Sequence, residues 1–384
     1  MPTQKVDRVK TVTLNNNRIY YSSICRLLFV ILFLAPVEAV KSNAALEFCP
    51  TVGNVGRVFT VNSTADVADN SPGDGVCSSG PAGSQMCTLR AAIHEANSWA
   101  GPDLIEIPAG HYTLRIAPVG SNDITTGDLD ITEALVISGA GADLTVIDAG
   151  RIADRLFEVG HISTADVQPV FTVEINNISI QNGFLAGMVG PGMYGGGIFN
   201  RGQQLTVESS KIRLNRALAG GGIYSTGNLC LSYGQVHNNR SQNFGGGVGN
   251  RGGTVTVLNR VSIANNIAGW ESGQLPGGGG FANINGDAYL NGTQITGNQV
   301  IRGAMGGGGI LNAGSSVMRL TAVLVKENFS NDQGGGISNT IGYGEGFTGA
   351  NPTLTIQNDS RIGWNTALRG GGIANNGILS IKET

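Results

Sequence analysis

The sequence lacks several features on which ligand binding or catalysis commonly depends. Its repeats contain no cluster of Lys and Arg, and the four histidines are scattered. Residues 1–44 hold six of the 24 basic and two of the 27 acidic residues, so the remaining chain has a formal charge of −7. Such a chain repels phosphate backbones and anionic lipid, and we therefore expect no nucleic-acid binding.

Cysteine is scarce, and no pair of cysteines has the CxxC or Cys/His spacing of a zinc site. Cys77 and Cys87 bracket a loop of Ser, Gly and Pro, and we expect them to form a disulfide in an oxidising compartment. Cys49 and Cys230 have no obvious partners. We expect no cofactor, with calcium as the one possible exception.

No apolar run is long enough to cross a bilayer, which takes about 20 helical residues. The run Leu27–Ala35 (LLFVILFLA) follows several basic residues and precedes small residues near Ala39 and Ala44. This pattern is typical of a cleaved export signal, so we predict that residues 1–44 are removed and that the protein is secreted or displayed at the cell surface. The mature chain would then have no transmembrane span; a signal anchor is the alternative.

Glycine, in contrast, is abundant, with 60 of 384 residues. It does not recur at every third position, which excludes collagen. Hydrophobic residues make up 41% of the chain, which argues against disorder. No segment after residue 100 keeps a helical apolar period without glycine interruptions. The composition therefore indicates many short strands joined by glycine-dependent turns.

A Gly-Gly-Gly-apolar unit recurs seven times, at intervals of 25 to 36 residues. Its apolar residues are Ile198, Ile223, Val248, Phe281, Ile310, Ile337 and Ile373. A second unit, an apolar residue three positions before an asparagine, follows in phase six times. Its asparagines are Asn215, Asn239, Asn266, Asn298, Asn328 and Asn365.

The length of the repeat predicts the fold. Two or three short strands with tight turns take up about 25 residues, and one such coil cannot bury its apolar face alone. Coils must therefore stack, with isoleucines in register inside and turn asparagines forming amide ladders. We predict an all-β, right-handed parallel β-helix over residues 99–384, in a monomer. Because the chain stops within a coil, at Leu379-Ser380-Ile381, we expect it to be truncated at the C-terminus.

Residues 45–98 are predicted to form the N-terminal segment and cap of this β-helix. The stretch TLRAAIHEAN, from Thr88 to Asn97, has an apolar stripe and an N-cap threonine, so we expect a helix. A helix at this place would cover the open core and block addition of a further strand.

Two motifs resemble those of known families. Cys87–Asn97 (CTLRAAIHEAN), followed by Asp103–Ile107, resembles the cap motif of CSLREA-domain proteins. The Gly-Gly-Gly-Ile and Ile-x-x-Asn units resemble the Gly-Gly-Ala-Ile and Phe-x-x-Asn repeats of polymorphic outer-membrane proteins. The resemblance covers about residues 57–384 and implies a β-helical passenger of an exported surface protein, with adhesion as its usual proposed role.

Two groups of residues are candidate binding sites. Asp66, Asp69 and Asp74 make an oxygen-rich loop of the kind that calcium uses, although aspartates also favour turns for other reasons. Phe199 and Tyr224 each follow an inward isoleucine in adjacent coils, so we expect them to point outward and to be exposed. They could contact a sugar ring or a partner, or form an aromatic ladder that stabilises the stack.

An enzyme is the alternative, because β-helices also host polysaccharide lyases and hydrolases. Asp128 and Asp130 would share one face of a strand, with Asp148, Asp154 and Arg155 one coil later. None of them lies in a recognisable catalytic motif, and a fold alone does not give a function.

We therefore predict a non-catalytic adhesin, passenger or stalk whose partner is a glycan or a cell-surface ligand. A polysaccharide lyase or glycoside hydrolase remains the alternative. A groove lined by several carboxylates together with Lys or Arg would favour that alternative.

Overall fold

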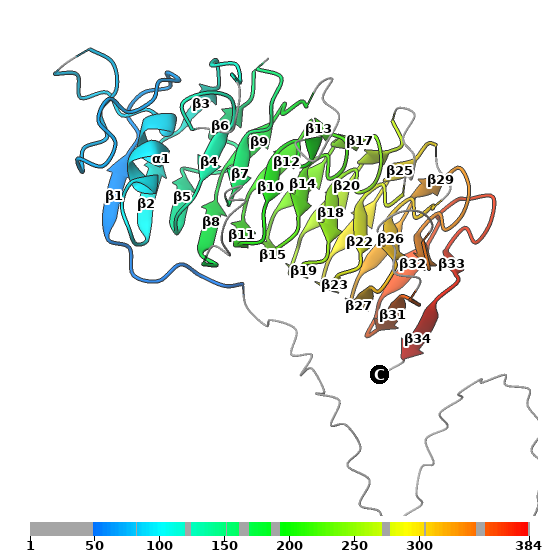
Figure 1. Cartoon of the computed structure of the whole chain (residues 1–384). Helices are drawn as coiled ribbons and strands as arrows, with labels where there is room; N and C mark the ends of the chain where they lie inside the picture. Colours follow the sequence, from blue (N-terminus) through cyan, green and yellow to red (C-terminus); the bar gives the residue numbers. More distant parts are fainter. Residues whose placement is uncertain are drawn as a thin grey trace, which may run out of the picture. The chain divides into compact units, whose positions relative to one another are not determined.

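The computed structural model describes residues 49–81, 83–119, 124–150, 152–160, 169–185, 193–270, 277–302, 305–342 and 350–382. Within these residues the strands form four parallel sheets, and the chain is a right-handed parallel β-helix, which confirms the predicted fold (Figure 1). The predicted export signal lies outside the described residues. In the described part of the chain, no helix has the length and apolar character needed to span a bilayer.

Sheet 1 has the longest strands and extends along the whole described stack. Its strands are, in spatial order, β1 (Arg57–Thr60), β2 (Asp103–Ile107), β5 (Leu135–Gly139), β8 (Thr172–Asn176), β11 (Gln204–Glu208), β15 (Asn228–Ser232), β19 (Thr254–Leu258), β23 (Asp287–Asn291), β27 (Val317–Thr321), β31 (Thr353–Gln357) and β34 (Ile378–Lys382). Its first strand, β1, belongs to the segment predicted as the cap, so the stack begins earlier than residue 99.

Sheet 2 contains the strands that follow the glycine triplets. They are β4 (Leu129–Ile131), β7 (Phe157–Val159), β10 (Ile198–Asn200), β14 (Ile223–Ser225), β18 (Val248–Arg251), β22 (Phe281–Ile284), β26 (Ile310–Ala313), β30 (Ile337–Thr340) and β33 (Ile373–Asn375). Each coil runs from sheet 2 through sheet 1 and sheet 3 before it returns to the next strand of sheet 2.

Sheets 3 and 4 complete the coil. Sheet 3 consists of β3 (Gly110–Thr113), β6 (Thr145–Asp148), β9 (Ser179–Gln181), β12 (Lys211–Arg213), β16 (Gln235–His237), β20 (Ser262–Ala264), β24 (Gln294–Thr296), β28 (Leu324–Lys326) and β32 (Arg361–Gly363). Sheet 4 consists of the two-residue strands β13 (Arg216–Ala217), β17 (Arg240–Ser241), β21 (Ile267–Ala268), β25 (Gln299–Val300) and β29 (Phe329–Ser330). In each coil with a strand of sheet 4, only two residues separate that strand from the preceding strand of sheet 3, and the first of the two has a positive φ, which makes a sharp bend.

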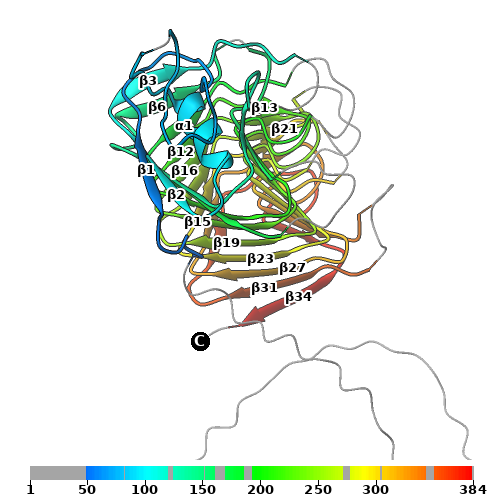
Figure 2. The same cartoon turned by 60° about the vertical axis from the view of Figure 1, so that its left-hand side comes forward.

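The apolar residues after the glycine triplets form the predicted interior column. Ile198 pairs with Ile223, and Ile223 pairs with Val248, in parallel register. The column continues through Phe281, Ile310 and Ile337, and its members from Ile198 to Ile337 are 0% exposed. Figure 2 shows the coils as successive rungs. Burial of each such side chain contributes about 1.5–3 kcal/mol, so the column is a main source of stability.

The glycine triplets have the two roles that the sequence suggests. The first glycine of each triplet has a positive φ, between +58° and +74°, which other residues adopt only with strain. The second glycine packs against the next coil: a Cβ on Gly246 would lie 2.3 Å from the carbonyl oxygen of Gly279. Successive coils can approach this closely only because the side chain is absent.

The predicted asparagine ladder is present inside the bend between sheets 3 and 4. Asn266 is typical: its Nδ2 donates to Oδ1 of Asn298 (3.0 Å) and to the carbonyl oxygen of Val236 (2.9 Å). Its own Oδ1 accepts from the backbone N–H (2.9 Å) and the Nδ2 (3.0 Å) of Asn239. The same pattern joins Asn215, Asn239, Asn266, Asn298, Asn328 and Asn365. The ladder satisfies buried backbone groups that the bend would otherwise leave without partners.

A second ladder lies where sheet 2 turns into sheet 1. Nδ2 of each asparagine donates to Oδ1 of the next, over 2.6 to 2.9 Å. Its members are Asn250, Asn283, Asn312, Asn339 and Asn375. The two ladders confirm that turn asparagines stack along the coils.

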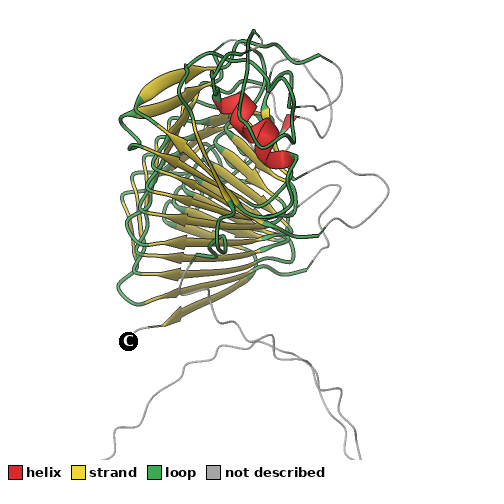
Figure 3. Cartoon of the chain, turned by 90° about the vertical axis from the view of Figure 1, so that its left-hand side faces the viewer, coloured by secondary structure: helices red, strands yellow, loops and turns green. Residues whose placement is uncertain are grey.

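The N-terminal end of the stack is covered by the predicted helix. The helix α1 (Leu89–Asn97) begins after Thr88, whose Oγ1 accepts from the N–H of Ala91 (3.1 Å). Leu89 and Ile93 are buried in the main core. Figure 3 shows α1 lying across the end of the coils. The disulfide between Cys77 and Cys87 is formed as predicted and ties the cap loop to the start of α1.

A second disulfide joins Cys49 to Cys230 on β15, a pairing that the sequence did not reveal. The segment before β1 runs over the outer face of sheet 1, where the N–H of Val52 donates to Glu174 on β8. Oγ1 of Thr206 on β11 donates to the carbonyl oxygen of Pro50 (2.7 Å). This segment therefore holds neighbouring coils together from outside.

Candidate functional site

The three aspartates of the cap loop do not form a common site. Asp66 forms an ion pair with the buried Arg90 (Nε to Oδ1, 2.6 Å) and accepts two backbone N–H groups. Asp69 also accepts two backbone N–H groups, and Asp74 accepts one. Their carboxylates stabilise the cap and its turns, so this geometry gives no support to the predicted calcium site.

Three other carboxylates do come together. Asp128, Asp130 and Glu158 offer oxygens within 4.8 Å of one another, and Asp130 pairs with Glu158 across β4 and β7. The two aspartates thus share a strand face, as predicted. Arg155 contacts Asp128 (Nη1 to Oδ2, 3.2 Å) and also Glu158, and a second arginine, Arg201 on the loop after β10, contacts Glu158 as well.

Burial perturbs the acids of this cluster. Desolvation, followed by the nearby charge of Glu158, raises the pKa of Asp130 to about 7. Desolvation also raises the pKa of Asp128 and of the neighbouring Asp154. A carboxyl group with a pKa near neutrality can act as a general acid, and three carboxylates could ligate a divalent cation.

Access and charge argue against both roles. Asp128, Asp130 and Glu158 are 4%, 7% and 1% exposed, and none of them lines the surface groove beside β1 or the one along the bend between sheets 3 and 4. Two guanidinium groups already supply positive charge to the cluster. Asp148 lies apart from it, on β6 of sheet 3, where it contacts His111 (3.0 Å). The cluster is best described as a buried ion-pair network.

The prediction that Phe199 and Tyr224 are exposed is wrong. Both point away from the main core, but they are only 4% and 2% exposed. They belong to a second apolar cluster on the outer face of sheet 2, with Tyr194 stacked on Tyr224 at 4.5 Å and Phe244 packed beside it. The residues before the glycine triplets cover this face, and the ring centres of Phe199 and Tyr224 lie 5.5 Å apart. The structure therefore supports the alternative, an aromatic ladder that stabilises the stack.

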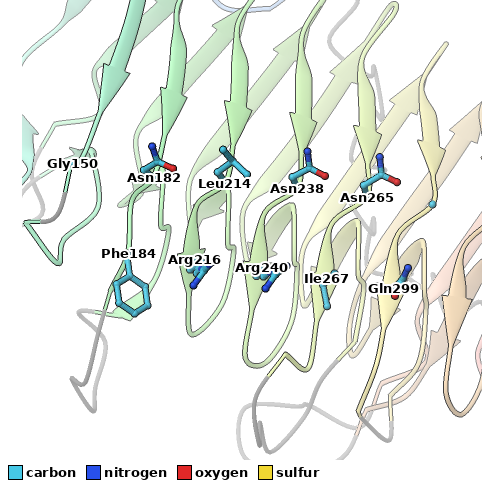
Figure 4. A pocket seen from close by; sticks show the side chains of 11 residues that line it. Gly150, Asn182, Phe184, Leu214, Arg216, Asn238, Arg240, Asn265, Ile267 and Gln299 are labelled. Carbon is cyan, nitrogen blue, oxygen red and sulfur yellow. The ribbon is translucent and has the colours of Figure 1, made fainter. Parts of the chain in front are cut away.

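An open groove lies along the bend between sheets 3 and 4. Its volume is about 910 Å³, which is within the usual range of ligand sites. It is lined by Gly150, Asn182, Phe184, Leu214, Arg216, Asn238, Arg240, Asn265, Ile267, Gly297 and Gln299. Figure 4 shows the labelled side chains in two rows along successive coils. We call this feature the corner groove.

The first row of the corner groove follows from the bend itself. Asn182, Leu214, Asn238, Asn265 and Gly297 each have a positive φ, between +55° and +66°, immediately before or at the sharp turn. Asparagine and glycine adopt this conformation most readily, which explains why amides predominate here. Because one residue of each coil occupies the same place, the amides repeat at the strand spacing of about 4.8 Å.

The second row consists of side chains at the start of the strands of sheet 4. Arg216 and Arg240 are neighbours in register, and Phe184 lies one coil earlier. The Cζ atoms of the two arginines lie 4.9 and 5.4 Å from the ring centre of Trp270. The described lining of the corner groove contains no carboxylate. The groove can therefore bind polar or anionic groups, and its described lining offers no acid–base pair.

A smaller groove lies beside β1 and the cap loop. It has a volume of about 510 Å³ and is lined by Arg57, Val58, Phe59, Thr60, Asn62, Gly75, Val76, Cys77, Gln85 and Cys87. It is more open and carries fewer polar side chains than the corner groove, so the corner groove is the candidate functional site.

Comparisons with known proteins do not assign this site. No protein-family model matches the chain, and searches of curated proteins and of solved structures find no match. The resemblance to CSLREA-domain and polymorphic outer-membrane proteins stays a prediction.

Proposed function

We propose that the chain is a non-catalytic, exported surface protein that binds a glycan in the corner groove. The observation that carries this proposal is the composition of that groove: amides, two guanidinium groups and the ring of Phe184 line it across several coils, without a carboxylate among the described lining residues. A lyase or hydrolase needs acid–base groups at the substrate, so this lining favours binding without turnover.

The chemistry of the groove suits a chain of sugars. Asparagine and glutamine amides both donate and accept hydrogen bonds, which matches sugar hydroxyl groups. Phe184 is 42% exposed, and an exposed ring can stack on the apolar face of a sugar. The row of equivalent groups, one per coil, fits a ligand that is itself an extended repeating chain.

A hydrolase is the second candidate, and one observation favours it. The pKa of Asp130, at about 7 beside Glu158, is in the range of a glycosidase general acid. For that role the buried cluster would have to open to a substrate. A catalytic assay therefore has to accompany the binding measurement.

A substitution that places a large side chain in the corner groove tests the proposal. Gln299 is exposed and lines the groove, so Gln299→Trp is expected to weaken polysaccharide binding at least about tenfold, or by 1.4 kcal/mol. Gln294→Trp is the control, because Gln294 is also exposed, on β24, but does not line the groove. Each variant is run in native gels that each contain one soluble polysaccharide of a panel, and its retardation measures its affinity for that polysaccharide.

The same polysaccharides are then analysed for chain length and for new reducing or unsaturated ends. We expect binding that Gln299→Trp weakens and Gln294→Trp does not, with no change in the polysaccharide. Shortened chains would contradict the non-catalytic proposal. Failure to bind any polysaccharide, or equal effects of the two substitutions, would contradict the proposed site.

A further inference from the structure

Two arginines of the corner groove are held side by side without a described counterion. Arg216 and Arg240 are register partners in the parallel pair of β13 and β17, so their backbones are about 4.8 Å apart. Arg216 is exposed and Arg240 half-buried. Like charges that face each other on neighbouring strands are destabilising, so this arrangement has a cost in the unliganded fold.

The surroundings leave the two guanidinium groups available to a ligand. Neither forms an ion pair or a side-chain hydrogen bond with any residue in the described part of the chain. Their described contacts are with ring faces: both lie near Trp270, and Arg216 also lies 5.9 Å from the ring of Phe184. Stacking on rings orients a guanidinium group and leaves its N–H donors free.

We infer that the corner groove selects an acidic polysaccharide, one that carries carboxylate groups on its sugars. This inference rests on the proposed function and specifies the ligand of the same groove. The arginine pair would bind carboxylates, since the planar guanidinium group matches a carboxylate with two parallel hydrogen bonds. The flanking amides of Asn238 and Asn265 would bind hydroxyl groups of the same chain.

The acidic composition of the whole chain does not oppose this inference. Charges more than about 8 Å apart are largely screened at physiological ionic strength, so the nearest groups decide the local potential. Asp148 lies beside one end of the groove, yet it is 7% exposed. Its Oδ2 accepts hydrogen bonds from Gln181 (2.7 Å) and Asn182 (2.9 Å) and lies 3.0 Å from Nε2 of His111, so this carboxylate is held by its own partners and does not pair with either arginine.

The amide and ring lining distinguishes a sugar chain from the other anionic polymers. A nucleic acid would require a longer basic track for its phosphates, and an acidic peptide would offer few hydroxyl groups to the row of amides. Single-stranded DNA and poly-aspartate therefore serve as competitors in the test.

The experiment compares polygalacturonate with the same polymer after full methyl esterification, which removes the charge and keeps the sugar chain. Wild-type protein is expected to bind the acidic form at least about tenfold more tightly, a difference of 1.4 kcal/mol, and to lose this preference as salt is raised. The double variant Arg216→Gln/Arg240→Gln is expected to bind both forms equally.

The control is Arg319→Gln/Arg361→Gln, which removes the same charge outside the groove, from β27 and β32. It should keep the preference for the acidic form. Equal wild-type affinity for both forms would overturn the inference and leave the proposed function intact. Binding to neither form would overturn the inference, and it would contradict the proposed function as well if no other polysaccharide of the panel bound. The inference would also be overturned if the control variant lost the preference for the acidic form. The same holds if DNA or poly-aspartate competed more strongly than polygalacturonate.

Discussion

The variant Gly246→Ala is expected to lose at least about 3 kcal/mol of stability, the upper part of the usual range for overpacking. A Cβ at this position would lie 2.3 Å from the carbonyl oxygen of Gly279 in the next coil. It would also lie 2.6 Å from the backbone carbon and oxygen of Ile267. All these atoms are backbone atoms whose positions are fixed by the sheets, so no side chain can move aside to relieve the contact.

Gly363→Ala is the matched control for this prediction. A Cβ on Gly363 meets nothing within 4 Å, and its φ lies outside the left-handed region. We expect this substitution to change the stability by no more than about 0.5 kcal/mol. Urea denaturation followed by circular dichroism compares the two variants with the wild type. Equal midpoints for Gly246→Ala and Gly363→Ala would show that the coils are not packed as closely as described.

The second large effect is expected for Asn266→Ala, which interrupts the asparagine ladder. The side-chain Oδ1 of Asn266 accepts hydrogen bonds from the backbone N–H and the Nδ2 of Asn239. Its Nδ2 donates to the carbonyl oxygen of Val236. Removing this amide leaves these buried groups without that partner, at about 1–3 kcal/mol for each group. We therefore expect a loss of at least about 3 kcal/mol in the free energy of unfolding.

Asn291→Ala provides the comparison, because Asn291 is exposed at the end of β23 and lies outside the ladders. Its effect should stay within about 0.5 kcal/mol. Thermal and urea unfolding of both variants measure the difference. If Asn266→Ala were no more destabilising than Asn291→Ala, the buried amides would not be the structural element that we describe.

The fold was predictable because two patterns recur in phase. The triplet glycines and the Ile-x-x-Asn units repeat at similar intervals, and only stacked coils bring every member of both sets into equivalent places. The inward position of Ile198, Ile223 and Val248 and the amide ladders followed from this argument. The capping helix followed from local signals, because Thr88 and the apolar stripe behind it are close in sequence.

Alternation along a strand predicts which way a side chain points, but not what covers it. Phe199 and Tyr224 do point outward, as expected. They are nevertheless buried, because Tyr194 and Phe244 fold back over sheet 2 from the segments before the glycine triplets. The sequence has no repeat signal for this second layer, since the covering residue differs from coil to coil.

Other features depend on distant segments. Cys49 and Cys230 are 181 residues apart, and they meet only because the N-terminal segment runs over sheet 1. The one available clue was that Cys230 lies between two inward leucines and so points outward. The sequence offered a way to place Glu158 beside Asp130: the three-residue segments Leu129–Ile131 and Phe157–Val159 can be aligned, and they form the paired strands β4 and β7. The corner groove arises from the angle of the bend, for which the sequence offers only a row of turn asparagines.

Hydroxyl-radical footprinting tests the position of the ligand most directly, because it measures the exposure of individual side chains. Phe184 (42% exposed) and Leu214 (46% exposed) lie in the corner groove, whereas Tyr233 (51%) and Leu368 (82%) lie outside it. With saturating acidic polysaccharide, we predict slower oxidation of Phe184 and Leu214 and unchanged oxidation of Tyr233 and Leu368. Protection of Tyr233 or Leu368, with Phe184 and Leu214 oxidised as fast as in the free protein, would contradict the assignment of the corner groove as the binding site.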